Sequence, residues 1–450
     1  MIRKHSFRGV MAGFATSALA LAVSAQAFAG TVTSDGADIV IKTKGGLEVA
    51  TTDKAFSFKI NGKLQWDATN FDGLQAADQN RPFDDTFNTF IRRGEFGLEG
   101  TAYTDWGWGL RLSYNGGDAG ANNDETKTEV DRAFVSYSGF DLATITVGRY
   151  GGEYGLENTT SSSWITGIER PFMYDFLNGD EDTKFGAMAK HSGDNYGLMA
   201  QAAHYGDKEK DGTANDKGND ENFGYTLRAH WAPYLNGTDV VHLAANYHNS
   251  SPDDSRARAR TRMGIRSDKD FRLTFGDVRV ADKDSEWVLE SGAQFGGLRA
   301  QAEYFQRNIS GENLVGANSD VDLSGYHAQV SYMFGTSRGY KGSDGRWDKP
   351  VDMKGTWEVF ARYESTTVDS DATAIPANLG LANIVAADTS DEFEASAMVV
   401  GVNYFATPAV RVSLNYIDYE VDNINTNNQV GGKNVQDDGK AIVGRLQYVF

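Results

Sequence analysis

The chain has 450 residues, with 43 Lys and Arg against 62 Asp and Glu, and it contains no Cys. Without thiols it cannot form a disulfide framework, a Cys-ligated zinc or iron–sulfur site, or a cysteine nucleophile. The net charge of −19 makes nucleic acid an unsuitable partner. Aromatic residues make up 12 % of the chain although its mean hydropathy is −0.47. A chain this polar needs a particular environment for so many aromatic side chains.

The first 29 residues have the pattern of an export signal. Three basic residues precede an apolar run over 10–23, and the segment ends in Ala27-Phe28-Ala29. This predicts a secretory signal peptide over residues 1–29, cleaved before Gly30. A membrane anchor would need about 20 uninterrupted apolar residues, and this run is shorter. Cleavage removes three basic and no acidic residues, which changes the net charge from −19 to −22.

The rest of the chain alternates with a period of two residues. From Phe56 to Thr69 the even positions are apolar or small and the odd positions are polar. Because successive strand residues face opposite sides, this pattern predicts strands with one apolar and one polar face. Sixteen stretches show it: 56–69, 89–101, 106–115, 130–138, 143–150, 183–191, 195–204, 222–232, 238–249, 286–296, 298–307, 323–334, 355–366, 391–405, 408–422 and 438–450.

Alternation alone also fits a soluble β domain, in which the apolar faces would pack together. Three features favour a membrane barrel instead. The stretches are about ten residues long, Trp and Tyr lie near their ends, and their number is even, as closed antiparallel barrels require. The chain also ends on a strand with the aromatic Phe450, an ending that resembles the assembly signal of outer-membrane barrels.

Long polar stretches separate many of the predicted strands. They cover residues 115–129, 151–182, 206–221, 250–285, 308–322, 335–354, 366–390 and 423–437. We expect long loops on the outer side of the membrane and tight turns on the periplasmic side. The stretch 151–182 is too apolar and aromatic for a solvated loop, and 250–285 carries seven arginines.

Four of these arginines, Arg256, Arg258, Arg260 and Arg262, are two residues apart. In an extended chain they would share one face at intervals of about 6.6 Å. A guanidinium grips phosphate or carboxylate through paired N–H donors, so inside a barrel the run would form a track for anions. The alternative is a solvated basic loop that contacts lipopolysaccharide phosphates or its own acidic neighbours.

The sequence resembles the phosphate-selective porins of the outer membrane, the OprO and OprP type, over nearly the whole chain after the signal peptide. The resemblance is carried by GTVTSDGADIVIKTKGGLEVATTD at 30–53, FIRR at 90–93, GTAY at 100–103 with Trp106, residues 161–170, RARTRMGIR at 258–266, AQAEYF at 300–305 and RLQYVF at 445–450. It implies an all-β fold, a transmembrane 16-stranded antiparallel β-barrel with inward-folded loops, with a short segment over 30–55 before a barrel over 56–450. It also implies a homotrimer in the outer membrane of a Gram-negative bacterium.

The resemblance also implies roles for individual residues. The anion-binding and pore-lining residues would be Arg92, Arg93, Asp131, Arg170, Arg256, Arg258, Arg260, Arg262 and Arg266. Among them, Asp131 would moderate anion binding, and Arg258 to Arg266 would form an arginine ladder with Arg256 as an addition. A basic cluster near the periplasmic side of the pore would consist of Lys42, Lys44, Lys54, Lys59 and Lys63.

The chain departs from the phosphate-type pattern at four positions. Glu95 replaces an aromatic residue, Gly151 replaces a Tyr or polar residue, and Asn158 and Ser163 replace two lysines. We expect the Glu95 carboxylate to pair with the guanidinium of Arg92 or Arg93 and to compete there with a passing anion. The loss of two lysines should weaken the attraction for anions. The loss of aromatic bulk should widen the passage.

The expected function is a porin that passes small anions, such as phosphate, pyrophosphate or related polyanions, by facilitated diffusion. A less selective anion porin is one alternative, and an outer-membrane barrel lipase is another. The seven His show neither HExxH spacing nor a recognisable Ser partner, so no catalytic residue, metal or cofactor is expected. A plugged receptor barrel would need a long N-terminal domain, and only residues 30–55 precede the first predicted strand.

Overall fold

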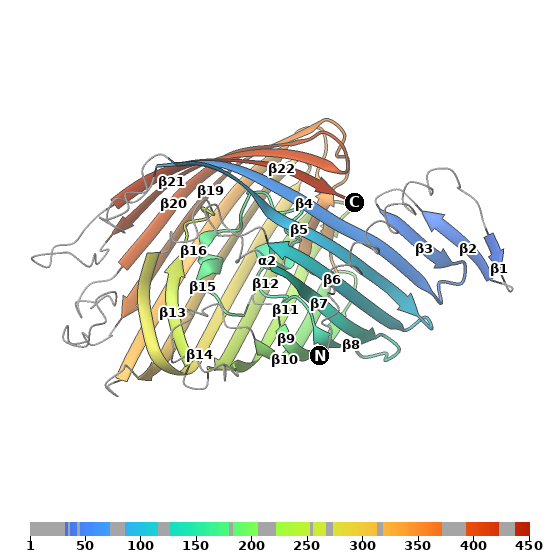
Figure 1. The fold of residues 1–450 in the computed structure, drawn as a ribbon, viewed down its shortest axis with the longest axis horizontal. Helices are drawn as coiled ribbons and strands as arrows, with labels where there is room; N and C mark the ends of the chain where they lie inside the picture. Colours follow the sequence, from blue (N-terminus) through green and yellow to red (C-terminus); the bar gives the residue numbers. More distant parts are fainter. Residues whose placement is uncertain are drawn as a thin grey trace, which may run out of the picture.

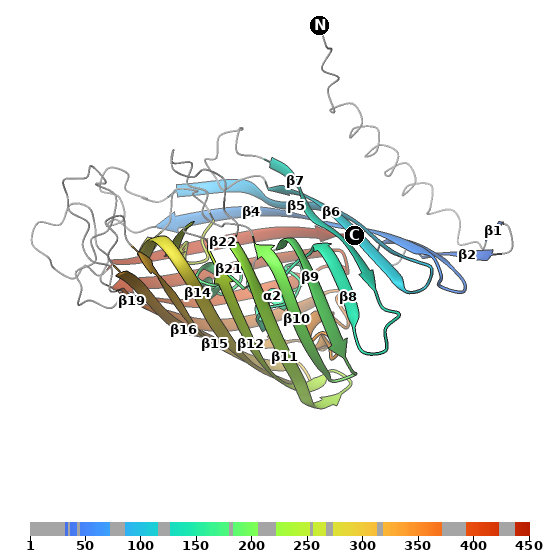
Figure 2. The same ribbon diagram turned by 90° about the horizontal axis from the view of Figure 1, so that it is seen from below.

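The computed structural model describes residues 32–34, 37–42, 46–72, 86–115, 127–179, 183–205, 222–252, 255–266, 273–312, 318–370, 393–422 and 437–450. Most of these residues lie in β-strands, which form a barrel (Figures 1 and 2). Within the described ranges no helix has the length and apolar character to cross a membrane. The predicted signal peptide lies outside the described residues and stays a prediction.

Sixteen antiparallel strands form the barrel wall, and each overlaps one predicted stretch. The expectation that 250–285 is a loop is wrong in part, because residues 255–261 and 273–285 belong to strands. They are β4 (Ser57–Asp72), β5 (Thr86–Ala102), β6 (Trp106–Asn115), β7 (Lys127–Tyr137), β8 (Thr144–Arg149), β9 (Thr183–Ser192), β10 (Tyr196–Tyr205), β11 (Asn222–Asn236), β12 (Asp239–Ser251), β14 (Leu273–Phe295), β15 (Leu298–Glu312), β16 (Asn318–Met333), β19 (Thr356–Ser370), β20 (Phe393–Phe405), β21 (Val410–Asp422) and β22 (Asp437–Val449). Pairing of β22 with β4 closes the barrel. The predicted strand number and closed antiparallel arrangement are confirmed.

The outward faces of the wall strands carry the apolar belt that a bilayer requires. Leu243, Leu289, Val400 and Leu414 are 42–51 % exposed. Aromatic residues lie at both borders of this belt. At the end with long connections, the loop end, they include Tyr225, Tyr326, Tyr363 and Tyr416, and at the end with short turns, the turn end, they include Trp231, Tyr332, Trp357 and Tyr448. These two levels match the aromatic girdles of membrane barrels.

The inner faces are not polar along their whole length, as a simple alternation predicts. Near the loop end of β20, Phe393, Ala395 and Val399 point inward and are buried, whereas Glu394 is exposed outside. These inner residues belong to an apolar cluster with residues of the loops inside the barrel. Beyond the girdle the outer face meets water and the inner face packs on protein, so the polar and apolar faces exchange sides.

Three short strands precede the barrel. They are β1 (Val32–Ser34), β2 (Ala37–Lys42) and β3 (Leu47–Thr51). Leu47 of β3 pairs with Ile60 of β4, just before β22 becomes the partner of β4 at Lys63. Figures 1 and 2 both show these strands projecting beside the start of β4. The division into a segment over 30–55 and a barrel over 56–450 stays a prediction.

The connection between β16 and β19 lies at the turn end, so the expectation that residues 335–354 form an outer loop is wrong. The reason is strand direction, because β16 runs from the loop end to the turn end. The connection contains the hairpin β17 (Arg338–Lys341) and β18 (Arg346–Pro350). It folds against the inner wall, where Trp347 is 1 % exposed and Tyr340 Oη lies 2.7 Å from His242 Nδ1.

The last residue of the chain completes the closure of the barrel. Phe450 N donates to the carbonyl of Gly62 at 3.1 Å, and Gly62 N donates to the carbonyl of Phe450 at 3.0 Å. A Cβ atom at residue 62 would lie 2.4 Å from the Phe450 ring and 2.5 Å from the carbonyl oxygen of Glu95. The closing seam therefore has room only for glycine at this position.

We expect Gly62→Val to lower the stability of the closed barrel, because the added side chain overpacks the seam at a cost of about 1–3 kcal/mol. Gly444→Ala on β22 is the matched control, since its Cβ would meet atoms no closer than 3.9 Å. Thermal unfolding in detergent, followed by the gel mobility of folded and unfolded protein, measures the difference. Equal unfolding temperatures for the two variants would contradict this account of the seam.

Candidate functional site

The connection from β8 to β9 folds into the barrel, and residues 150–179, its described part, are called the inner loop. It contains the helix α2 (Leu156–Thr159) and the 3-10 helix η3 (Phe172–Asp175). Among its large side chains, Tyr154, Phe176 and Leu177 are fully buried. The apolar and aromatic composition of this stretch therefore serves to pack it inside the barrel.

Polar side chains of the wall hold the backbone of the inner loop. Carbonyl oxygens accept hydrogen bonds as follows: Ser163 from Gln447 at 3.0 Å, Ile165 from Arg411 at 2.8 Å, Thr166 from Asn403 at 2.9 Å and Glu169 from Arg362 at 3.2 Å, with Arg338 bonding Trp164 and Arg445 bonding Ile168. Glu303 in turn accepts the N–H of Leu156 and the hydroxyl of Tyr174, both at 2.7 Å. The wall thus satisfies loop backbone that water would otherwise solvate.

Most of these wall arginines are also neutralised. Arg338 and Arg299 contact Glu358 at 2.6 and 3.3 Å, Arg362 contacts Glu364 at 2.9 Å, Arg228 contacts Glu290 at 2.8 Å, and Arg445 contacts Asp67 at 2.7 Å. All five arginines are at most 3 % exposed. Buried cations need such partners. Four of these arginines also bond the inner loop, whereas Arg228 donates to the carbonyls of Asp344 and Gly345 between β17 and β18.

The opposite part of the wall keeps its inner face partly open. Arg92, Arg111 and Arg132 of β5–β7 have side chains that are 17, 27 and 37 % exposed. We call this region the open strip, and it consists of Arg92, Arg93, Glu95, Arg111, Asp131, Arg132 and Arg149. The inner loop covers these side chains less completely than it covers the arginines of the other wall strands.

Two β-bulges bring consecutive residues of the strip to the same side. In β5, Gln65 pairs with Arg93 and the next residue, Trp66, pairs with Ile91, so Arg92 is the extra residue. In β7 the register shift at Arg111 leaves Asp131 as the extra residue beside Arg132. Such a bulge lets two neighbours on the strand oppose one partner residue. Arg92 and Arg93 can therefore both face the interior.

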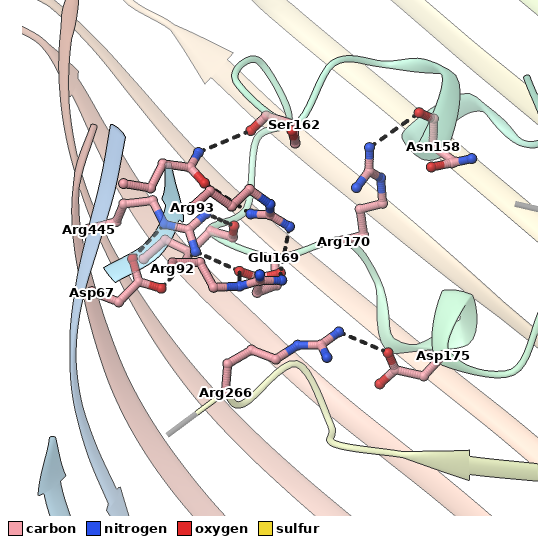
Figure 3. Close-up of polar contacts among 12 residues, drawn as sticks. Asp67, Arg92, Arg93, Asn158, Ser162, Glu169, Arg170, Asp175, Arg266 and Arg445 are labelled. Carbon is pink, nitrogen blue, oxygen red and sulfur yellow. Dashed lines mark hydrogen bonds and ion pairs between the residues drawn. The ribbon is translucent and has the colours of Figure 1, made fainter. Parts of the chain in front are cut away.

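The two arginines meet a carboxylate of the inner loop, as Figure 3 shows. Arg92 Nε and Nη2 donate to the two oxygens of Glu169 at 2.9 and 3.1 Å. Arg93 Nη2 lies 3.6 Å from Glu169 Oε2, and Arg445 Nη2 lies 2.6 Å from Oε1. Burial raises the pKa of Glu169, but the three guanidiniums outweigh it and hold this pKa well below its usual range. The carboxylate therefore stays ionised.

Glu95 lies on the open strip, but its partners differ from the expected ones. Its carboxylate is 2.8 Å from Lys63 Nζ and 3.6 Å from Arg111 Nη1 rather than paired with Arg92 or Arg93. The register between β4 and β5 explains this, because Glu95 stands directly opposite Lys63. Lys63 also donates to Ser162 Oγ of the inner loop at 2.5 Å.

Arg170 is bound to its own loop. Its guanidinium donates to the carbonyls of Glu157, Asn158 and Thr160 at 3.0–3.2 Å, where the last turn of α2 leaves acceptors unpaired. The side chain of Asn158 donates to the carbonyl of Gly152 at 3.4 Å. Ser163 is buried, and Gly151 lies at the start of the inner loop, partly exposed.

The arginine run forms β13 (Ser255–Thr261), which pairs with the first part of β14. Arg256, Arg258 and Arg260 lie in this strand, and the alternate residues Ala257 and Ala259 are buried against the barrel interior. Asp175 of η3 ties the end of the run to the inner loop. It accepts Thr261 Oγ1 at 2.9 Å, Arg262 N at 3.1 Å and Arg266 Nη2 at 3.1 Å.

The structure describes four of the five lysines of the predicted cluster, and three of these four form ion pairs. Lys42 pairs with Glu48 at 2.8 Å on β2–β3, Lys59 with Glu99 at 3.7 Å, and Lys63 with Glu95. Lys54 occupies the turn between β3 and β4. Lys44 lies outside the described residues.

Sequence reasoning missed Arg111, Arg132, Arg149 and Glu169 as members of the site. Glu169 directly precedes the predicted Arg170, and Arg132 directly follows the predicted Asp131, so adjacency was the available signal. A regular strand places neighbours on opposite faces, which argues against such pairs. The bulges that overturn this rule are visible only in the strand pairing.

A closed 16-stranded barrel with an apolar belt and an inner loop defines an outer-membrane porin. The chain belongs to the family of phosphate-selective porin O and P, whose model matches residues 58–450. It is 38 % identical, over an alignment of 479 residues that covers 100 % of both chains, to Porin O of Pseudomonas aeruginosa. The predicted family, its porin function and its outer-membrane location are therefore confirmed.

Solved structures with a similar fold are more distant in sequence. The outer membrane channel DcaP of Acinetobacter baumannii is 12 % identical with a TM-score of 0.52, covering 88 % of this chain and 98 % of that one. OmpF of Salmonella typhi is 15 % identical with a TM-score of 0.50, covering 88 % of this chain and 99 % of that one. At these identities the likeness supports the barrel fold alone.

We expect Asp175→Ala to loosen the contact between β13 and the inner loop, because three donors lose their shared acceptor. Single-channel recording should show a larger and noisier open current, by about 20 % or more if the passage widens. Asp194→Ala, at an exposed short turn, is the matched control. Identical current traces for both variants would mean that Asp175 does not restrain the passage.

Proposed function

We propose that this porin passes small anions along the open strip, with phosphate, pyrophosphate or related polyanions as its solutes. The observation that carries the proposal is the charge of the strip, which has five arginines, Arg92, Arg93, Arg111, Arg132 and Arg149. The carboxylates in ion-pair contact with them are Glu95, Asp131 and Glu169. The excess is positive, in a chain whose total charge is negative.

Local charge decides selectivity because distant charge is screened. At physiological salt, exposed charges more than about 8 Å apart interact weakly, whereas a partly desolvated guanidinium beside the path acts directly on a solute. A paired guanidinium edge also suits the oxygens of phosphate. The family description, which names phosphate-selective porins, supports anions as the solutes.

We further propose that β13 forms the approach to the strip. The support for this part of the proposal is that Ala257 and Ala259 of β13 are buried. Asp175 connects the end of β13 to the inner loop that bears Glu169. In this proposal Arg256, Arg258, Arg260, Arg262 and Arg266 act as a ladder that leads anions toward Arg92 and Arg93, with Asp131 moderating their binding and Arg170 shaping the loop.

The assembly and the chemistry follow the family resemblance. We propose a homotrimer embedded in outer-membrane lipid and lipopolysaccharide, without enzymatic activity. A less selective anion porin is the second candidate, and it is favoured by Glu95, which neutralises Lys63 beside the path. Bilayer recording with competing anions separates the two, because a phosphate-preferring pore shows chloride current blocked by low phosphate.

Selectivity tests the proposal directly. In a salt gradient across a planar bilayer, the reversal potential should show preference for anions, and Arg132→Gln should lower the anion-to-cation permeability ratio about twofold. Lys440→Gln, which removes the same charge from an exposed position outside the barrel, should leave the ratio unchanged. Cation preference in the unmodified protein would refute the proposed function.

The ladder is tested by changing Arg258 and Arg260 together to Ala. The barrel should stay folded, since β13 is not one of the sixteen wall strands, while the phosphate concentration that halves the chloride current should rise about fivefold. Gel mobility of the folded form serves as the control for structure. If the folded variant shows unchanged block of chloride current by phosphate, the arginine run is a basic surface loop instead. Such a loop would suit contact with lipopolysaccharide.

A further inference from the structure

The carboxylate of Glu169 occupies the arginine pair that the proposed function assigns to passing anions. It accepts the Nε–Nη2 edge of Arg92 in a two-point contact at 2.9 and 3.1 Å and lies 3.6 Å from Arg93. This is the edge through which a guanidinium grips phosphate or carboxylate from solution. A solute that binds here therefore meets donors that are already engaged.

The remaining contacts fix Glu169 in this place. Arg445 Nη2 lies 2.6 Å from Glu169 Oε1 and is itself held by Asp67 at 2.7 Å. The carbonyl of Glu169 accepts Arg362 Nη1 at 3.2 Å. Figure 3 shows Glu169 between the wall arginines and the rest of the inner loop. The carboxylate is part of a rigid, buried network rather than a freely moving side chain.

The arginine pair still has donors to offer a solute. Among the described residues, no hydrogen-bond partner contacts Arg92 Nη1. The side chains of Arg92 and Arg93 are 17 and 13 % exposed. Since Glu169 stays ionised, it cancels part of the positive charge that these donors present.

We propose that Glu169 is a specificity-determining residue, a built-in competitor whose carboxylate weakens the hold of the Arg92–Arg93 pair on phosphate so that the anion is released and passes on. The inference rests on the proposed anion function. Conduction requires binding that is favourable enough for entry and weak enough for exit. A permanently bound carboxylate provides this balance without removing either arginine.

The test is block of chloride current by inorganic phosphate in planar bilayers, with the full chain reconstituted. Glu169→Gln keeps the size of the side chain and removes its charge, so the half-blocking phosphate concentration should fall about fivefold or more at neutral pH. Open-channel chloride conductance should not fall. Glu169→Asp, which keeps the charge but withdraws it from the pair, should give a smaller fall and remains informative if Glu169→Gln does not fold.

Glu358→Gln is the matched control. Glu358 is also buried and contacts Arg338 and Arg299, which bond the same loop, but no ion pair joins it to Arg92 or Arg93 among the described residues. If Glu169 has only a structural role, both variants should loosen the loop to the same extent. Block of the chloride current by phosphate should then be unchanged or weaker. Either that result or equal tightening in Glu358→Gln overturns the inference. Cation preference in the unmodified protein would instead defeat the proposed function itself.

Discussion

The structure depends on one requirement, which is that the backbone of the inner loop must find hydrogen-bond partners inside the barrel. An unpaired buried carbonyl or N–H costs free energy comparable to a lost hydrogen bond. The wall strands β14–β22 meet this requirement with side chains such as Arg362, Arg411 and Asn403. Because these donors lie on β14–β22, most of the loop is anchored there, and it reaches the open strip on β5–β8 through Glu169.

Arginine therefore serves two purposes in this molecule. On the anchoring side, residues such as Arg338 and Arg445 are almost completely buried and are paired with carboxylates, so their charge is balanced. On the open strip, Arg111 and Arg132 are partly exposed, and their nearest carboxylate contacts are 3.6–3.8 Å long. Buried arginines thus anchor loops, whereas partly exposed arginines are candidate contacts for solutes.

The polarity of the outer surface follows from the membrane, and the polarity of the inner surface follows from the loops that pack on it. Between the aromatic levels the wall is apolar outside and polar inside, as lipid and a polar interior require. Nearer the loop end the sheet extends beyond that belt, and residues such as Phe393 turn an apolar face inward onto the loops. The hairpin β17–β18 approaches the interior from the turn end, so segments from both ends fill part of the barrel.

The sequence by itself determined the wall strands, because a period of two marks each of them. All sixteen overlap the stretches that alternation predicted, although β14 begins at Leu273, inside a predicted loop. The family resemblance, rather than periodicity, pointed to Arg92, Arg93 and Asp131 as candidates. Only the tertiary structure decided which charges meet: that Glu95 contacts Lys63, that Glu169 occupies the arginine pair, and that 335–354 enters from the turn end. The physical reason is register, since the neighbours of a strand residue belong to another strand, and a single bulged residue reverses which side chains face inward.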